Sequence, residues 1–287
     1  MNNLIDKICL ITGASSGIGK ITAHQLAQQG ATIIMVSSNL DRGKQVLNEI
    51  QKSTGNQNLA FFQCDLTSQI SIHKLVAKVK AAYHHVDILI NNAGGLMKSL
   101  QMTEEGIEKT FALNHIAPFL LTHLLLDQLK KSSQARIINV TSSGHSVGVF
   151  DLDNLNAEKS FNGPFLYVQA KLANILFTYE LARRLKETAI TVNCLHPGFV
   201  QTNFGENANW LYRIFVNRLL KPFMISPEEG AQTTLYLATS NEVKHISGKY
   251  FVKKKPVKSA RKTYDESLAK QLWGISEKLT NLNQINS

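Results

Sequence analysis

"LITGASSGIGK", residues Leu10 to Lys20, is the stretch that decides the fold of this 287-residue chain. It follows an apolar run, leads into a helical pattern and contains Gly13, Gly17 and Gly19. Glycine is needed where a turn is tight and where backbone approaches a phosphate, and the N–H groups that open a helix can bind that phosphate. A glycine triplet alone is a weak signal, but a strand before it and a helix after it are the context a dinucleotide site requires. The stretch therefore predicts a strand–turn–helix unit that binds a pyrophosphate.

Strand-like and helix-like patterns alternate along the rest of the chain. Apolar, β-branched segments occupy residues 7–12, 31–37, 59–64, 86–91, 135–141, 189–195 and 248–251. Helical patterns lie between them, and Gly30 is placed to end the first helix as its C-cap. Apolar strands separated by helices predict an α/β fold: a doubly wound parallel sheet of about seven strands, with helices on both faces. With no linker or repeat, we expect a single domain over residues 1–287, with an insertion at 203–226 and a basic C-terminal extension with a helix at 253–287.

From its composition and first residues we expect a globular protein without a secretory signal. Apolar residues make up 44% of the chain, enough for a substantial core. The first residues have no basic, apolar and small-residue sequence of a secretory signal, and the most apolar run, 116–126, is too short to cross a bilayer. Cys9, Cys64 and Cys194 lie in separate apolar runs without CxxC spacing. We expect buried, reduced cysteines and a cytoplasmic protein.

The net charge of +10 is concentrated near the C-terminus. From Lys244 onward there are ten Lys/Arg against three Asp/Glu, a net +7. A solvated basic segment is the simplest interpretation, and contact with an acidic membrane surface or attraction of an anionic cofactor are the alternatives. No nucleic-acid partner is expected, because no recognition motif or interleaved aromatic pattern accompanies the charge.

Further motifs follow in chain order: "CDL" at 64–66, "NNAG" at 91–94, Asn114, "INVTSS" at 138–143, "YVQAK" at 167–171 and "HPGFVQT" at 196–202. With the spacing of the glycines, they resemble the short-chain dehydrogenase/reductase superfamily, whose fold is the Rossmann fold. The segments at 227–238, 247–251 and 264–279 resemble its retinol-dehydrogenase-like branch. The resemblance covers nearly the whole chain and implies an oxidoreductase, NAD(P)(H) as cofactor and a homo-oligomer.

The cofactor-binding residues are expected along these motifs. They are Gly13, Ser15, Ser16, Gly17, Ile18, Gly19, Ser37, Ser38, Asn39, Asp65, Leu66, Asn92, Ala93, Gly94, Tyr167, Lys171, Pro197, Gly198, Val200 and Thr202. The resemblance implies that Asp65 and Leu66 contact the adenine, that "NNAG" lines the cofactor, and that Thr202 reaches the carboxamide.

The end of the second strand selects between the two dinucleotides. An acidic residue there would bind the ribose hydroxyls and favour NAD. This chain has Ser37, Ser38 and Asn39 instead, so no carboxylate repels a 2′-phosphate. Relatives of the retinol-dehydrogenase-like branch often carry an arginine where Ser38 stands, so the expected phosphate clamp is missing, although Arg42 is near in sequence. NADP(H) is favoured, with NAD(H) as the alternative.

Tyr167 and Lys171 lie four residues apart within a helical pattern at 163–186, so they share a helix face. A free phenol has a pKa of about 10, about 4 kcal/mol away from ionising at pH 7. An ammonium about 5 Å away contributes roughly 3 kcal/mol toward the phenolate at an effective dielectric constant of 20. The pair is therefore predicted to carry a proton, with Tyr167 as general acid/base. Surface decoration is the alternative for such a pair taken alone.

Ser142 and Asn114 complete the predicted catalytic set. Ser142 follows the fifth strand and would hydrogen-bond the substrate oxygen, with Thr141 and Ser143 as rivals. The resemblance implies that Asn114 holds a water that relays protons from Lys171. Three of the nine histidines lie near these motifs, at 115, 145 and 196. They have no metal-ligand spacing and are expected to be structural or solvent-facing, so no metal is predicted.

The insertion "WLYRIFVNRLLKPF", residues 210–223, is apolar and aromatic with cations interspersed. A covering helix with an apolar underside suits a lipophilic carbonyl or alcohol. A plain packing helix, or a helix lying on a bilayer surface, would have the same sequence pattern. We expect a small hydrophobic carbonyl/alcohol substrate. A dinucleotide-binding sensor without turnover is the alternative function.

Overall fold

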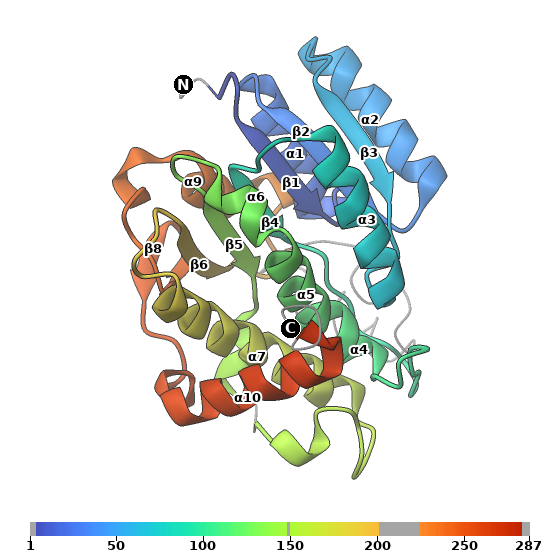
Figure 1. Cartoon of the computed structure of the whole chain (residues 1–287), viewed down its shortest axis with the longest axis vertical. Helices are drawn as coiled ribbons and strands as arrows, with labels where there is room; N and C mark the ends of the chain where they lie inside the picture. Colours follow the sequence, from blue (N-terminus) through green and yellow to red (C-terminus); the bar gives the residue numbers. More distant parts are fainter. Residues whose placement is uncertain (1–3, 148–149, 201–223, 283–287) are drawn as a thin grey trace.

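The computed structural model describes residues 4–147, 150–200 and 224–282. At its centre is one sheet of eight strands in the order β3-β2-β1-β4-β5-β6-β7-β8 (Figure 1). The strands are β1 Ile8–Thr12, β2 Thr32–Ser37, β3 Leu59–Gln63, β4 Ile88–Asn91, β5 Arg136–Val140, β6 Thr191–His196, β7 Lys249–Val252 and β8 Lys255–Val257. All neighbours are parallel except β7 and β8. The order reverses between β1 and β4, and at such a point the carboxyl ends of the strands leave a ligand crevice.

Helices cover both faces of the sheet because alternate side chains of each buried strand point to opposite sides. In β1, Cys9 and Ile11 belong to the core formed with α1, α2 and α9, whereas Leu10 belongs to the core formed with α3, α5 and α7. The helices are α1 Gly17–Gln28, α2 Leu40–Thr54, α3 Gln69–Ala82, α4 Lys109–Phe111, α5 Ala117–Leu124, α6 Leu126–Lys130, α7 Gly163–Arg184, α9 Pro227–Thr239 and α10 Glu266–Thr280. The predicted fold class, a doubly wound parallel α/β sheet, is confirmed.

The seven segments expected to be strands correspond to β1–β7. The C-cap of α1 is Gln29 rather than the predicted Gly30. Gly30 is the next residue and has φ of +90°, so the glycine lies one position past the C-cap, in the left-handed conformation that ends many helices. The cysteines are buried and unpaired, and burial raises the pKa of all three thiols. They pack as small apolar side chains.

An eighth strand, β8, lies within the basic segment that sequence patterning assigned to an extension. It pairs with β7 through a two-residue turn at Lys253 and Lys254, whose φ angles are +48° and +65°. Positive φ at both central residues is the type I′ pattern that best joins twisted strands, although Asn-Gly is the usual sequence. Pro256 and the exposed Lys255 on this outermost strand discourage pairing with another chain. Part of the basic charge therefore lies on an ordered sheet edge.

The C-terminal helix α10 lies across α7 (Figure 1). Leu272 and Ala269 of α10 pack against Leu172 and Leu176 of α7 in one apolar cluster. The indole of Trp273 lies 4.0 Å from the guanidinium carbon of an arginine on α7. The indole is therefore held both by cation–π attraction to this arginine and by its own burial. The C-terminal segment is thus packed onto the helix that carries "YVQAK".

Among the described residues, no helix is both long and apolar enough to cross a membrane. The predicted insertion at 203–226 lies outside the described residues except for Met224 to Ser226. Ser226 begins α9 with a capping box, in which its hydroxyl accepts from the amide of Glu229 and the Glu229 carboxylate accepts from the amide of Ser226.

Candidate active site

Helix α7 brings Tyr167 and Lys171 to the carboxyl edge of the sheet. Most of the helix is buried, and Lys171 is only 3% exposed. Its Nζ lies 5.6 Å from the centroid of the Tyr167 ring and donates a 3.1 Å hydrogen bond to the carbonyl of Val140 at the end of β5. A buried lysine at the carboxyl edge of the sheet is not an exposed surface residue, so the interpretation of the pair as surface residues without a role in the interior is excluded. Burial lowers the pKa of Lys171 to about 8.

Gly94 allows the lysine and Asn114 to converge. A Cβ added at Gly94 would lie 2.9 Å from Nζ of Lys171 and 2.7 Å from Oδ1 of Asn114. Only a glycine leaves room for both groups at this position. "NNAG" is in turn tied to β1, because Oγ1 of Thr12 accepts from the amides of Asn92 and Ala93 at 3.0 Å each. The motif thus connects the glycine-rich turn to the side chains of Lys171 and Asn114.

Asn114 lies in a π-helical turn, Ala112–Ile116, between α4 and α5. Turns of this kind occur frequently at functional sites. Its side-chain amide donates to the carbonyls of Gly95 and Thr110 at 2.7 Å each. The backbone carbonyl of Asn114 accepts from the side-chain amide of Asn174 in α7 at 2.6 Å. The π-turn itself was not predicted from the sequence, because no residue pattern distinguishes it from ordinary helix.

Ser142 follows β5 and begins the 3-10 turn Ser143–Ser146, called η2. Its Oγ accepts from the amide of Gly144 at 3.2 Å and keeps its own proton to donate. A Cβ on Gly144 would lie 3.6 Å from that oxygen and 3.2 Å from Val168, the neighbour of Tyr167. The serine loop therefore adjoins α7 at the position of Tyr167.

The two rivals of Ser142 are placed differently. The hydroxyl of Thr141 is buried and donates to the carbonyl of Leu195 on β6 at 3.0 Å. Ser143 is held through its backbone amide, which donates to Nδ1 of His196 at 3.2 Å. Burial and the neighbouring His145 lower the pKa of His196 to about 4, so His196 is neutral and can accept this bond.

The glycine-rich turn has the shape a pyrophosphate requires. Gly13 and Gly17 have φ of +67° and +50°, and a Cβ on Gly19 would lie 2.3 Å from the carbonyl oxygen of Gly13. The side chain of Ser16, the N-cap of α1, makes no capping hydrogen bond. The first N–H groups of α1 are thereby left without a side-chain cap, as phosphate binding at a helix N-terminus needs. Ser15 and Ile18 belong to the same turn and first helical residues.

The residues expected to hold the adenosine end lie at the ends of β2 and β3. Ser38 is exposed, whereas Ser37 is buried and its Oγ donates to the carbonyl of Asn39 at 3.4 Å. Oδ1 of Asn39 caps α2 by accepting from the amide of Arg42 at 2.9 Å. Asn39 thus has a structural role that sequence reasoning missed, and Ser38 and Arg42 are exposed beside it.

Asp65 and Leu66 differ in their surroundings. Leu66 is buried and, with Ala93 and Thr12, borders a small hollow beside the crevice. Asp65 is exposed, and its Oδ1 accepts from the amide and hydroxyl of Thr67 at 2.9 and 2.8 Å. Its second carboxylate oxygen remains available to a ligand.

Residues after β6 close the same edge. Gly198 has φ of +102°, and Val200 forms a bridge with Ile225 ahead of α9. Pro197 precedes them at the end of β6, and Thr202 lies outside the described residues. The expected site residues that are described therefore come from the carboxyl ends of β1 to β6, from the start of α1, from the π-helical turn before α5 and from α7.

The three histidines left unassigned by sequence are all buried. Nε2 of His115 lies 2.9 Å from the hydroxyl of Ser276 in α10, and Nδ1 lies 3.4 Å from Oδ1 of Asn174. His145 lies between the carbonyl of Ser142 and the amide of Ala260. They are structural rather than solvent-facing, and a histidine three residues after the expected serine was the signal that could have drawn attention to His145.

A comparison with models of known protein families identifies the family of this chain. Residues 7–210 match the family model described as short chain dehydrogenase. The chain belongs to the short-chain dehydrogenase family, and it is an oxidoreductase of the retinol-dehydrogenase-like branch.

Individual relatives resemble the chain over most of its length. Human retinol dehydrogenase 14 is 40% identical over 96% of this chain and 87% of its own, and human polyprenol dehydrogenase is 37% identical over 96% and 85%. Among solved structures, an uncharacterized protein from Mycobacterium paratuberculosis is 30% identical, covers 98% of this chain and 96% of its own, and superposes with a TM-score of 0.79.

Proposed function

We propose that this protein interconverts a hydrophobic alcohol and its aldehyde or ketone with a nicotinamide dinucleotide, and that Tyr167 is the general acid/base. One observation carries the proposal: a buried ammonium, Lys171, lies against the ring of Tyr167 at the sheet edge that also holds the glycine-rich turn. Proton transfer must accompany hydride transfer to a carbonyl, and a phenol beside a buried cation is suited to it.

The dinucleotide, when bound, supplies or accepts the hydride. Tyr167 donates its proton to the substrate oxygen as a carbonyl is reduced, and accepts one when an alcohol is oxidised. Lys171 stabilises the phenolate form through its positive charge. Ser142 Oγ donates a hydrogen bond to the same substrate oxygen and stabilises the charge developing there. Asn114 holds the turn beside Lys171, where a water can pass protons to solvent.

NADP(H) is the favoured cofactor, with NAD(H) as the alternative. Supporting NADP(H), no carboxylate lies at Ser37, Ser38 or Asn39, and Arg42 is exposed one turn into α2. Asp41, beside Arg42, is the group that opposes a 2′-phosphate.

A hydrophobic substrate is supported by the apolar sequence of the insertion and by the relatives, whose names specify retinol and polyprenol. The homo-oligomer and the cytoplasmic location implied at the sequence level stay predictions.

The proposal is tested by following the absorbance of reduced nicotinamide with NADPH or NADH against aldehydes and ketones of increasing chain length. We expect turnover with NADPH, and kcat/KM that rises with apolar length. A sensor without turnover would bind the dinucleotide, detected by quenching of nicotinamide fluorescence, yet reduce no carbonyl in the panel. That result would replace the enzymatic proposal with the sensor.

A further inference from the structure

His145 joins the serine loop to the C-terminal segment. Its Nδ1 lies 2.7 Å from the carbonyl oxygen of Ser142, and its Nε2 lies 3.2 Å from the backbone nitrogen of Ala260. A backbone amide can only donate, so Nε2 must accept. Nδ1 therefore carries the ring proton and donates it to Ser142. One neutral, buried imidazole thus connects residue 142 with residue 260.

The other end of this connection is fastened to α7. The hydroxyl of Ser259 lies 2.8 Å from that of Tyr179 in α7 and 2.6 Å from that of Thr263. The Ser259 amide donates to the hydroxyl of Tyr264 at 3.1 Å. Ala260 is consequently held on the same rigid helix that carries Tyr167, about three turns earlier.

Helix α7 thereby positions both Tyr167 and Ser142, the two side chains proposed to contact the substrate oxygen. Tyr167 is fixed by α7 itself, and Ser142 is fixed to α7 through His145, Ala260 and Ser259. The ring of His145 also packs against Tyr250 of β7, with centroids 4.9 Å apart. Since a displacement of about 1 Å at a reacting centre can reduce a rate by about 10²-fold, such a connection affects turnover.

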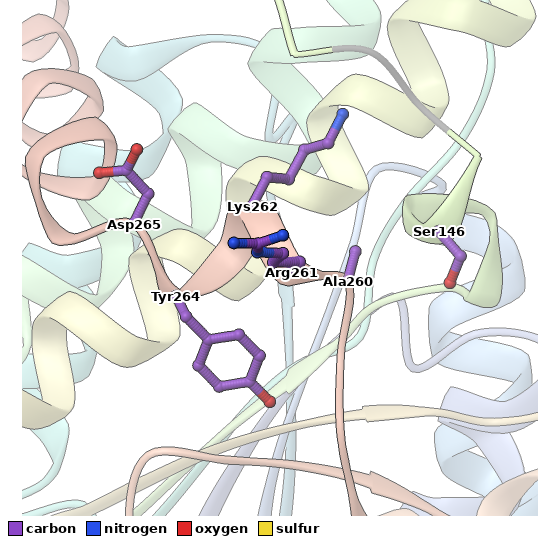
Figure 2. A pocket seen from close by; sticks show the side chains of 6 residues that line it. All are labelled: Ser146, Ala260, Arg261, Lys262, Tyr264 and Asp265. Atoms are coloured by element: carbon purple, nitrogen blue, oxygen red, sulfur yellow. The ribbon is translucent and has the colours of Figure 1, made fainter.

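The outer side of the connection is open. A cavity of about 690 Å³ is bordered by Ser146 from η2 and by Ala260, Arg261, Lys262, Tyr264 and Asp265 (Figure 2). The last five residues include η7, the 3-10 turn Arg261–Tyr264. Among the described residues, this cavity lies between the two segments outside His145, and the two hydrogen bonds of the imidazole connect them beside it.

We propose that His145, held by the backbone amide of Ala260, is a positioning residue for Ser142, so that residues 259–264 of the C-terminal segment form part of the active site. This inference rests on the proposed role of Ser142 in the reaction. The proposal gives residues 259–264 a function, whereas sequence patterning described this segment only as part of a basic extension.

Ala260→Pro is the sharpest variant. Ala260 has φ of −55° and ψ of 141°, which the proline backbone adopts without strain. The substitution removes the N–H and places the ring Cδ against Nε2 of His145, so it breaks the contact and displaces the imidazole. Glu266→Pro is the matched control, because residue 266 is the first position of α10, where proline is tolerated and the amide has no helical partner. Both variants are measured alone and combined with Ser142→Ala, by steady-state kinetics, dinucleotide binding and thermal unfolding.

We expect Ala260→Pro to lower kcat roughly tenfold, with the KM for the carbonyl and the dinucleotide Kd changed less than about twofold, whereas Glu266→Pro retains parental kinetics. In the Ser142→Ala background, Ala260→Pro should lower kcat by less than about twofold, because the group being positioned is already absent. A purely structural role would give the same loss in both backgrounds.

The inference is overturned if folded Ala260→Pro keeps the parental kcat, or if its loss is equal with and without the Ser142 hydroxyl. If Ala260→Pro lowers the unfolding temperature by more than about 5 °C, His145→Phe replaces it in the same cycle, since a phenyl ring retains the packing on Tyr250. Parental activity in Ser142→Ala would instead remove the serine from the proposed mechanism, and the positioning role with it.

Discussion

Lys171 and Tyr167 meet inside the protein: the ammonium nitrogen lies 5.6 Å from the centre of the phenol ring, and the lysine is shielded from water. At this distance a unit charge favours a phenolate by about 3 kcal/mol at an effective dielectric constant of 20. Burial that strengthens this attraction also destabilises the charged lysine, as its lowered pKa indicates. The site therefore maintains a charge at the expense of fold stability.

Replacing Lys171 should stabilise the fold at neutral pH. The pKa of Lys171 falls from an ordinary value of 10.5 to about 8 on folding. The unfolded chain then binds more protons between these values, so the lysine opposes folding by up to about 3 kcal/mol below pH 8 and by progressively less up to pH 10.5. Lys171→Met should be more stable than the parent at pH 7 and lose this advantage toward pH 10.5, as measured by urea unfolding, while its turnover falls. A gain in stability of Lys171→Met that is the same at every pH would contradict the lowered pKa of Lys171.

Gly94 should not tolerate a methyl group. In Gly94→Ala the added carbon would lie within 3 Å of both Lys171 Nζ and Asn114 Oδ1, so one of these groups must move. We expect kcat to fall by at least about tenfold, with the protein still folded by circular dichroism. Gly274→Ala in α10 is the control, because its Cβ meets no atom within 4 Å. It should raise stability by about 0.5–1 kcal/mol and leave kinetics unchanged.

The dinucleotide preference should follow the end of β2. Ser38→Asp places a carboxylate where ribose hydroxyls bind in NAD enzymes and where a 2′-phosphate is repelled. We expect the ratio of kcat/KM for NADPH to that for NADH to fall by roughly 10²-fold or more. Arg42→Ala should lower the same ratio by a smaller factor. A ratio unaffected by either substitution would mean that the phosphate, if bound, lies elsewhere.

Replacing the two lysines of the β7–β8 turn should increase the stability of the protein. Lys253 and Lys254 adopt positive φ without being glycine or asparagine, which costs of order 1 kcal/mol each. Lys253→Asn with Lys254→Gly supplies the preferred type I′ pair. Urea unfolding should show a gain of about 1 kcal/mol with parental activity. A loss of stability would indicate that the turn is held by its lysine side chains, for instance by the 3.2 Å bond from Lys254 to Gln232.

Sequence patterning predicted the elements that hydrophobic periodicity controls. The apolar runs of β1–β7 and the glycine after α1 were recognisable because burial and left-handed backbone leave direct marks on residue choice. β8 was missed because Lys255 and Pro256 have low strand propensity, and their pairing depends on the neighbouring β7. Its edge position is a property of the assembled sheet.

The site was predictable where the chain itself sets the spacing. Tyr167 and Lys171 share a helix face by virtue of their four-residue separation. His145 contacts a residue 115 positions away in the sequence, and His115 contacts one 161 positions away. No local sequence pattern could predict such contacts. Asn39 was expected to face a ligand, yet its side-chain oxygen caps α2, a competition that only the folded backbone reveals.

Tyr167→Phe tests the central claim most directly, with Tyr236→Phe as the control that removes a phenolic hydroxyl from α9 instead, where it donates to Glu242. Single-turnover reduction of a carbonyl by NADPH should slow by about 10²–10⁴-fold in Tyr167→Phe, with dinucleotide affinity within about threefold of the parent, and Tyr236→Phe should react at the parental rate. A Tyr167→Phe enzyme that binds the dinucleotide and reduces the carbonyl as fast as the parent would contradict the account.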